Sequence, residues 1–125
     1  MSSQTELELP SNLRGICSFS FRDNGLVVIT TKGNITYLGA CKIFDFLSEN
    51  EPSLTIIVLD IQEARVMDNA TITYLVKLQF HFGQKGKQFV VIGISEGIMV
   101  SMNKLGVSQT LAPYQTIEEI IEAYS

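Results

Sequence analysis

The chain has 125 residues, of which 46% are hydrophobic, and its formal net charge is -4. A domain of this length can bury a real hydrophobic core, so a largely disordered chain is excluded. The Lys and Arg residues are scattered, which argues against a nucleic-acid partner and against attachment to an anionic membrane surface.

The N-terminal residues 1–10, MSSQTELELP, have neither the basic start nor the apolar stretch of a signal peptide. No apolar run approaches the roughly 20 residues of a membrane span. Cys17 and Cys41 lie far apart and fit no metal-ligand or redox spacing, so both are expected to be small buried side chains in a reducing compartment. We therefore expect a cytoplasmic protein without membrane insertion, with a flexible tail over residues 1–12 and one domain over residues 13–125.

Two apolar segments joined by a tight turn begin the domain. Residues 16–22 alternate between apolar and polar side chains, and residues 25–31 are apolar and β-branched. Between them, DNG at residues 23–25 is a strong signal for a two-stranded hairpin. The pattern predicts an antiparallel hairpin.

A helix and then a buried strand are predicted next. Residues 36–49, TYLGACKIFDFLSE, have helical periodicity with Thr36 as the N-cap, and Phe46 points away from the apolar stripe. Residues 53–60, SLTIIVLD, form a continuous apolar run, which is typical of a strand covered on both faces. The apolar stripe of the helix comprises Tyr37, Ala40, Cys41, Ile43, Phe44 and Leu47.

The rest of the chain continues to alternate between helices and strands. A helix is expected from about Asn69 to Phe82, with Gly83 or Gly86 ending it. Four elements follow: a buried strand at 87–93, a helix at 95–106 capped by Ser95, a short edge strand within QTLAPY at 109–114, and a closing helix at 116–124 capped by Thr116. This order predicts one α/β domain with a mixed sheet and about four helices, and the 53–60 and 87–93 strands are expected in the interior of that sheet.

Two motifs hint at catalysis, and each has a simpler explanation. Residues 93–97, GISEG, match the G-x-S-x-G motif of hydrolases, but the only histidine, His81, precedes Ser95 instead of following it. Ser95 is explained as a helix N-cap. Residues 83–87, GQKGK, have the wrong spacing for a phosphate loop and follow a helix instead of preceding one. The sequence therefore predicts no enzyme, catalytic residue or cofactor, and no ligand pair marks a metal site.

The 69–82 helix has one apolar and one polar face. The apolar stripe comprises Ile72, Leu75, Val76, Gln79 and Phe82, and the opposite face comprises Ala70, Thr73, Tyr74, Lys77 and His81. We expect the second set to be exposed. Tyr74, an aromatic residue on a face that is otherwise polar, is the first candidate for a partner contact, and Phe46 is the second.

In the order and spacing of its segments, the chain over residues 15–124 resembles a STAS domain, the fold of bacterial anti-sigma-factor antagonists and of sulfate-transporter tails. The segments that carry the resemblance are GLVVITTKGNIT, IIVLDI, KQFVVIGIS, NKLGV and TIEEIIEAY, with the strand-to-helix junction between the second and the third.

The resemblance implies that the strand-to-helix junction corresponds to a phosphorylation motif. In antagonists of this family it usually reads Asp-Ser-Ser-Gly or Asp-Ser-x-Gly, and a partner kinase phosphorylates the first Ser. Here Asp68 matches the Asp, Asn69 stands at the phosphorylated Ser, Ala70 at the second Ser and Thr71 at the Gly. An amide accepts no phosphate, so Asn69 is expected to keep a polar helix cap that stays neutral, like the unphosphorylated state.

The resemblance implies a non-catalytic regulatory module of signal transduction and transcription, which binds a protein through the start and exposed face of the 69–82 helix. The partner would be a serine-kinase anti-sigma factor, or another STAS or transporter protein, and a homodimer stays open. Two alternatives remain: a subunit of a transporter or signalling assembly, and a domain that senses a nucleotide, an anion or a lipid. The expected partner-binding residues are Asp68, Asn69, Ala70, Thr73, Tyr74, Lys77 and His81.

Overall fold

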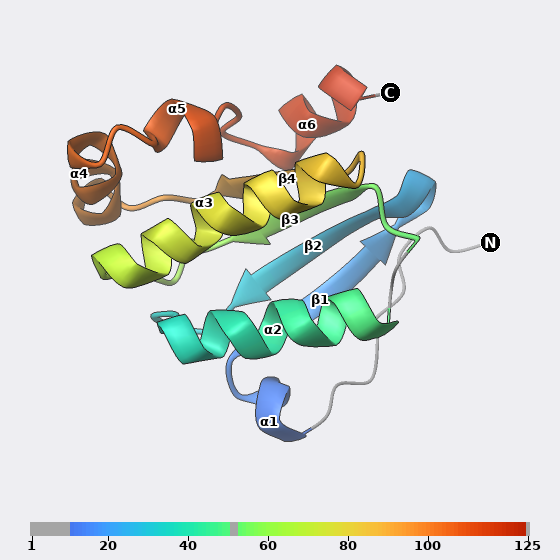
Figure 1. Cartoon of the computed structure of the whole chain (residues 1–125), viewed down its shortest axis with the longest axis horizontal. Coiled ribbons are helices and arrows are strands. Elements are labelled where there is room, and N and C mark those ends of the chain that lie inside the picture. Colours follow the sequence, from blue (N-terminus) through green and yellow to red (C-terminus); the bar gives the residue numbers. More distant parts are fainter. Residues whose placement is uncertain (1–10, 51–52, 125) are drawn as a thin grey trace.

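A four-stranded mixed β-sheet forms the centre of the computed structural model, which describes residues 11–50 and 53–124 (Figure 1). The strand order is β1-β2-β3-β4; β1 and β2 are antiparallel, and β2, β3 and β4 are parallel. The predicted α/β class and mixed sheet are confirmed. The strands are β1 (Cys17–Arg22), β2 (Leu26–Thr31), β3 (Ile56–Asp60) and β4 (Gln88–Ile92).

Six helices accompany the sheet in the described part of the chain: α1 (Ser11–Arg14), α2 (Tyr37–Asn50), α3 (Asn69–Gln84), α4 (Glu96–Lys104), α5 (Ser108–Leu111) and α6 (Ile117–Tyr124). The four helices expected from the sequence are α2, α3, α4 and α6. Their predicted caps are confirmed at three starts, because Thr36 Oγ1 accepts from the Gly39 N–H (3.0 Å), Ser95 Oγ from the Ile98 N–H (3.4 Å) and Thr116 Oγ1 from the Glu119 N–H (3.2 Å). Of the proposed tail, residues 11 and 12 lie in α1, and residues 1–10 lie outside the described residues.

The predicted hairpin is confirmed, and its turn explains the DNG sequence. Asn24 and Gly25 both have left-handed backbone angles, with φ of 66° and 74°. A turn with two such residues follows the natural twist of paired strands, and Asn and Gly adopt this conformation at the lowest cost. A Cβ atom on Gly25 would also lie 2.8 Å from Thr55 Oγ1, so the position has no room for a side chain.

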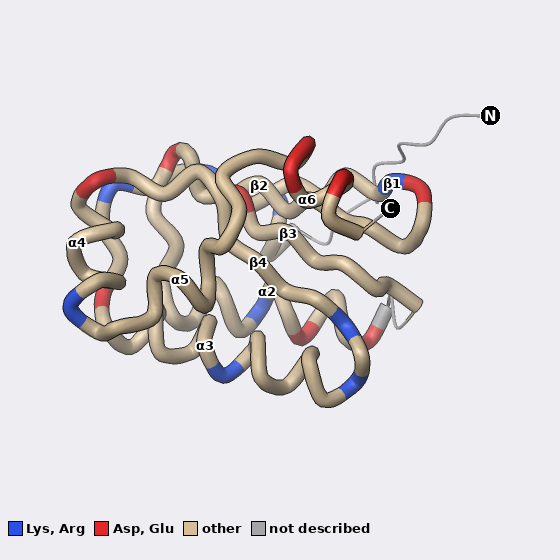
Figure 2. Tube along the Cα trace, turned by 90° about the horizontal axis from the view of Figure 1, so that it is seen from above, with Lys and Arg blue, Asp and Glu red and all other residues tan. Residues whose placement is uncertain are grey.

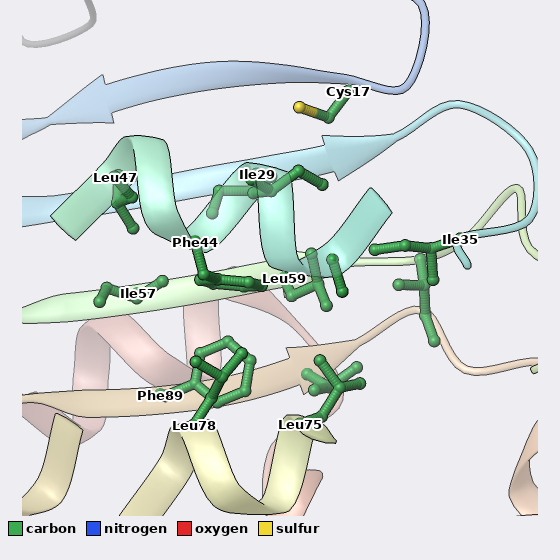
Figure 3. Close-up of a cluster of buried hydrophobic side chains, with 14 of the residues drawn as sticks. Cys17, Ile29, Ile35, Phe44, Leu47, Ile57, Leu59, Leu75, Leu78 and Phe89 are labelled. Carbon is green, nitrogen blue, oxygen red and sulfur yellow. The ribbon is translucent and has the colours of Figure 1, made fainter. Parts of the chain in front are cut away.

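Strand alternation divides the apolar side chains between two cores on opposite faces of the sheet. The larger core fills the space under α2 and α3 (Figure 3), and the smaller core lies under α6 (Figures 1 and 2). In β3, for example, Ile57 and Leu59 belong to the larger core, and Ile56 and Val58 belong to the smaller one. Both faces are covered, as the continuous apolar runs of β3 and β4 predict.

The sheet edge at β4 corrects two predictions. The 87–93 strand was expected in the interior of the sheet, but β4 is an edge strand. An apolar run indicates that both faces of a strand are covered, but it does not indicate whether the strand has a hydrogen-bonded neighbour on each side. The expected edge strand within QTLAPY is also wrong, since residues 108–111 form α5.

The Gln79 side-chain amide donates to the carbonyls of Phe89 (3.0 Å) and Thr110 (2.6 Å), so it occupies an outward-facing acceptor of β4. Pro113, which has no N–H, is poorly suited to a pairing strand.

The helix stripes also differ in detail from the prediction. On α2, Tyr37 is 49% exposed, Cys41 is half-buried, and Phe46 is not turned outward but packs edge-on against Phe19, with ring centroids 5.8 Å apart. On α3, Thr71 and Leu78 join the buried residues, while Val76 and Gln79 are only half-buried. The buried stripe is therefore narrower than predicted on α2 and is shifted toward Thr71 and Leu78 on α3.

Candidate protein-interaction site

The segment between β3 and α3 is held by hydrogen bonds from both sides. Asn34 Oδ1 accepts from the backbone N–H groups of Arg65 (2.7 Å) and Val66 (3.2 Å), and Ser95 Oγ donates to the Arg65 carbonyl (3.3 Å). The loop before α2 and the start of α4 therefore hold the middle of this segment, at residues 65 and 66. As a result α3 begins at a defined place at the carboxyl end of the parallel strands (Figure 1).

Asp68, and not Asn69, caps α3. Asp68 Oδ1 accepts from the Thr71 N–H (2.8 Å) and from the Thr71 hydroxyl (2.6 Å), while Asn69 is the first helical residue. Hydrogen bonds from the side chain and backbone of Thr71 hold the pKa of Asp68 below its usual value. The expectation that Asn69 is the polar cap is thus wrong. The Asn69 residue is exposed at the helix start, where a partner can reach it.

The exposed face of α3 largely agrees with the prediction. Ala70, Thr73, Lys77 and His81 are exposed, together with Asn69. These side chains come from successive turns of one helix, so they form a continuous strip.

Tyr74 is the exception on this face, because it is half-buried between α3 and α2. Its ring lies edge-on to that of Tyr37, with centroids 5.2 Å apart. Burial, followed by a side-chain hydrogen bond with Cys41, raises the pKa of Tyr74 above its usual value. The prediction of a fully exposed Tyr74 is therefore wrong.

Sequence reasoning missed the large apolar side chains that are exposed here. Phe80 on α3 is 69% exposed, Val66 in the junction segment 65%, and Leu38 beside Tyr37 at the start of α2 63%. Phe80 follows Lys77 by one turn and Thr73 by two, so the helical periodicity of α3 could have found it. Val66 belongs to an irregular segment, where no periodicity reports exposure.

The segment that contains α3 and β4 has a charge pattern opposite to that of the whole chain. From Asn69 to Ser95 there is no Asp or Glu, but there are Lys77, Lys85 and Lys87. In Figure 2, basic positions mark α3 and the turn that follows it, and acidic positions mark α6 on the other side of the sheet. The strip therefore offers neutral polar, apolar and basic groups to a partner, and Asp68 already has hydrogen bonds from Thr71.

The described residues contain no group of three or more His, Cys, Asp or Glu side chains that could hold a metal ion. His81, exposed on α3, has its ring beside Phe82, with centroids 5.6 Å apart. None of the helices in the described part of the chain has the length and apolar composition needed to cross a bilayer.

A comparison with family models matches residues 21–120 to the STAS domain. This match covers most of the chain, so the protein belongs to the STAS domain family. A search of curated proteins found no match.

Solved structures support the same fold. The anti-sigma factor antagonist SpoIIAA in its unphosphorylated form matches with a TM-score of 0.65 and 15% identity, over 86% of this chain and 96% of that one. A sulfate transporter family protein from Wolinella succinogenes matches with a TM-score of 0.62 and 18% identity, over 72% and 74%. The murine anion transporter Slc26a9 gives a TM-score of 0.55 and 18% identity, over 68% of this chain but 14% of the transporter. At these identities the likeness shows the fold alone.

Proposed function

We propose that this STAS domain is a non-catalytic regulatory module that binds a protein partner through the start and exposed face of α3. The proposed contact residues are Asp68, Asn69, Ala70, Thr73, Lys77 and His81, with Tyr74 contributing its exposed edge. The partner is a serine-kinase anti-sigma factor or another STAS or transporter protein, and the complex works in cytoplasmic signal transduction that regulates transcription.

One observation carries this proposal: the first turn of α3 after its Asp68 cap has no charged side chain and stands beside exposed apolar side chains. Asn69 and Ala70 are exposed at the first turn, and Tyr37, Leu38 and Val66 are exposed on the two segments that flank it. Protein interfaces usually combine an apolar centre with a polar rim, and exposed aromatic and aliphatic side chains beside polar groups can supply both. The cap at Asp68 and the bonds from Asn34 hold this surface in place, which lowers the entropy cost of binding.

Asn69 gives the module its regulatory character. A phosphoserine at this position would carry about -1.5 to -2 charges at neutral pH, and an amide cannot gain them. Position 69 thus stays uncharged, and we infer that the module stays competent to bind. Thr71 is buried with its hydroxyl bonded to Asp68, which makes it a poor phosphate acceptor, whereas Thr73 is exposed.

The test compares two substitutions at one exposed position. Partner proteins recovered on the immobilised chain are identified by mass spectrometry, and their affinity for purified variants is measured by calorimetry. Asn69→Asp places a second carboxylate next to Asp68 and is expected to weaken binding, while Asn69→Ser is expected to bind like the wild type. Gln84→Glu, which adds the same charge at the opposite end of α3, is the matched control and is expected to bind normally.

Two results contradict the proposal. Undiminished binding by the Asn69→Asp protein would show that the helix start is not at the contact. Phosphate found on Thr73 or Thr71 after incubation with a partner kinase would show that the module is still switched. Peptide mapping of the wild type and of the Asn69→Ser variant gives this second answer.

A further inference from the structure

A cavity of about 530 Å³ lies at the carboxyl end of β4, apart from the exposed face of α3. Its walls are the end of β4, helices α4 and α5, and the segment that leads into α6 (Figure 1). The volume is within the range of small-molecule sites, and the carboxyl ends of parallel strands are where such sites form in α/β sheets. The polar residues that line it are Gly93, Asn103, Ser108, Gln109, Tyr114 and Gln115.

These lining groups are polar but carry no charge. Asn103, Gln109 and Gln115 each offer an amide with both donors and an acceptor, and the Ser108 hydroxyl can donate or accept. Among the described residues that line the cavity there is no Lys, Arg, His, Asp or Glu. A charged ligand would lose hydration here without gaining an opposite charge, so the site favours a neutral one.

An apolar surface completes the cavity on the side of the sheet. Ile92 at the end of β4, Ile94 just after it, Met99 on α4 and Ala112 after α5 contribute aliphatic groups. Tyr114 adds the face of a half-buried ring, which Tyr124 holds in place with its own ring centroid 6.0 Å away. The ligand therefore needs a modest apolar face as well as many hydrogen-bonding groups.

From this lining we propose that the cavity binds a neutral polyhydroxylated small molecule, such as a monosaccharide or a cyclic polyol. Sites for drug-like and aromatic ligands are lined mainly by apolar and aromatic side chains with few polar groups. Here amides and a hydroxyl dominate, which matches a ligand with hydroxyl groups over most of its surface and C–H groups on one side. This site is independent of the protein contact proposed on α3.

The side-chain amide groups themselves report binding. In ¹⁵N–¹H spectra of the full chain, titration with D-glucose, D-galactose or myo-inositol is expected to shift the NH₂ signals of Asn103, Gln109 and Gln115 in a saturable way for at least one compound. Asn69 and Gln84 lie outside the lining and serve as internal references. Glucose 6-phosphate is the matched charged probe and is expected to bind more weakly than glucose.

Substitutions in the lining test whether the ligand binds in this cavity. Asn103 and Gln109 are exposed, so Asn103→Ala and Gln109→Ala should fold normally, which thermal unfolding checks. Each substitution is expected to lower the affinity for the neutral ligand about threefold to tenfold, the usual effect of losing one neutral hydrogen bond. Gln84→Ala, a change at another exposed amide, is the control that should leave affinity unchanged.

Three results would overturn the proposal. One is the absence of saturable shifts with all three neutral compounds. Another is equal or tighter binding of glucose 6-phosphate, which would indicate an anion site. The third is unchanged affinity in the Asn103→Ala, Gln109→Ala double variant, which would place the ligand elsewhere.

Discussion

The two faces of the sheet are covered very differently. On one face, α2 and α3, with 14 and 16 residues, enclose the larger core, in which Phe19, Phe44 and Phe89 are almost fully buried. On the other face α6 has 8 residues, and one of them, Ile120, is fully buried over an aliphatic patch. The first face therefore supplies most of the buried area that stabilises the fold.

This difference fits the contact surface that we propose on α3. Interfaces bind well when the side chains that make them are held by a packed layer beneath. The buried side of α3 lies on the larger core, so its exposed side is presented with little freedom. The less enclosed face has a shorter helix, and the cavity opens between α4, α5 and the segment that enters α6.

The largest effect should come from the centre of the larger core. Phe44 is 1% exposed, and its ring lies 5.3 Å from that of Phe89 and 6.2 Å from that of Phe82. Phe44→Ala should lower the free energy of unfolding by about 3–5 kcal/mol, because it removes buried area and leaves a cavity. Urea titration measures this. A loss near 1 kcal/mol would mean that the two faces do not differ as described.

A substitution in the smaller core should lower the free energy of unfolding by less. Ile120→Ala is expected to lower the free energy of unfolding by about 2–3 kcal/mol, in the lower part of the range for such substitutions, because Ile120 is the one buried residue of a short helix over the smaller core. The same urea titration applies. A loss of stability equal to that caused by Phe44→Ala would contradict the conclusion that the larger core contributes more to stability.

Tyr74 should give an intermediate result that sharpens the boundary between core and contact surface. Because its ring is half-buried against Tyr37, Tyr74→Ala should cost about 1–2 kcal/mol, whereas a fully exposed tyrosine would cost almost nothing. Tyr74→Phe keeps the ring and loses only the hydroxyl bond with Cys41, so it should cost less. Equal melting temperatures for wild type and Tyr74→Ala would contradict the assignment.

The smallest effect, and one that depends on pH, is expected at the cap of α3. Folding lowers the pKa of Asp68 below its ordinary value of 3.8, so the stabilisation is complete above that value and is lost as the pH falls through the lowered pKa. Asp68→Ala should lower the melting temperature by a few degrees at pH 7. The difference in melting temperature between the variant and the wild type should become smaller in acid. A difference that stays constant down to pH 2 would show that the charge of Asp68 does not stabilise the helix.

The sequence predicts the elements of this fold well, because local patterns determine them. The DNG turn, the apolar run of β3 and the caps Thr36, Ser95 and Thr116 each act over a few residues. Placement of β4 at the edge depends on which strands pair, and no local pattern carries that information. Likewise α5 depends on the Gln79 amide reaching the β4 edge from another helix.

The candidate site was predicted in part. The exposed strip of α3 follows from its periodicity, and the junction from the segment order. The partial burial of Tyr74 does not, because it depends on the Tyr37 ring of another helix, α2, whereas the exposure of Phe80 could have been found from the periodicity of α3.

The two cysteines differ enough to make the chain convenient for site-specific labelling. Cys17 is buried in the larger core, and burial raises the pKa of its thiol to about 11, so at neutral pH it stays protonated and shielded. Cys41 is half-buried on α2 and reaches the hydroxyl of Tyr74. A thiol-reactive dye should therefore attach first at Cys41, beside the proposed contact face, and its fluorescence could follow a partner's arrival without any engineered cysteine.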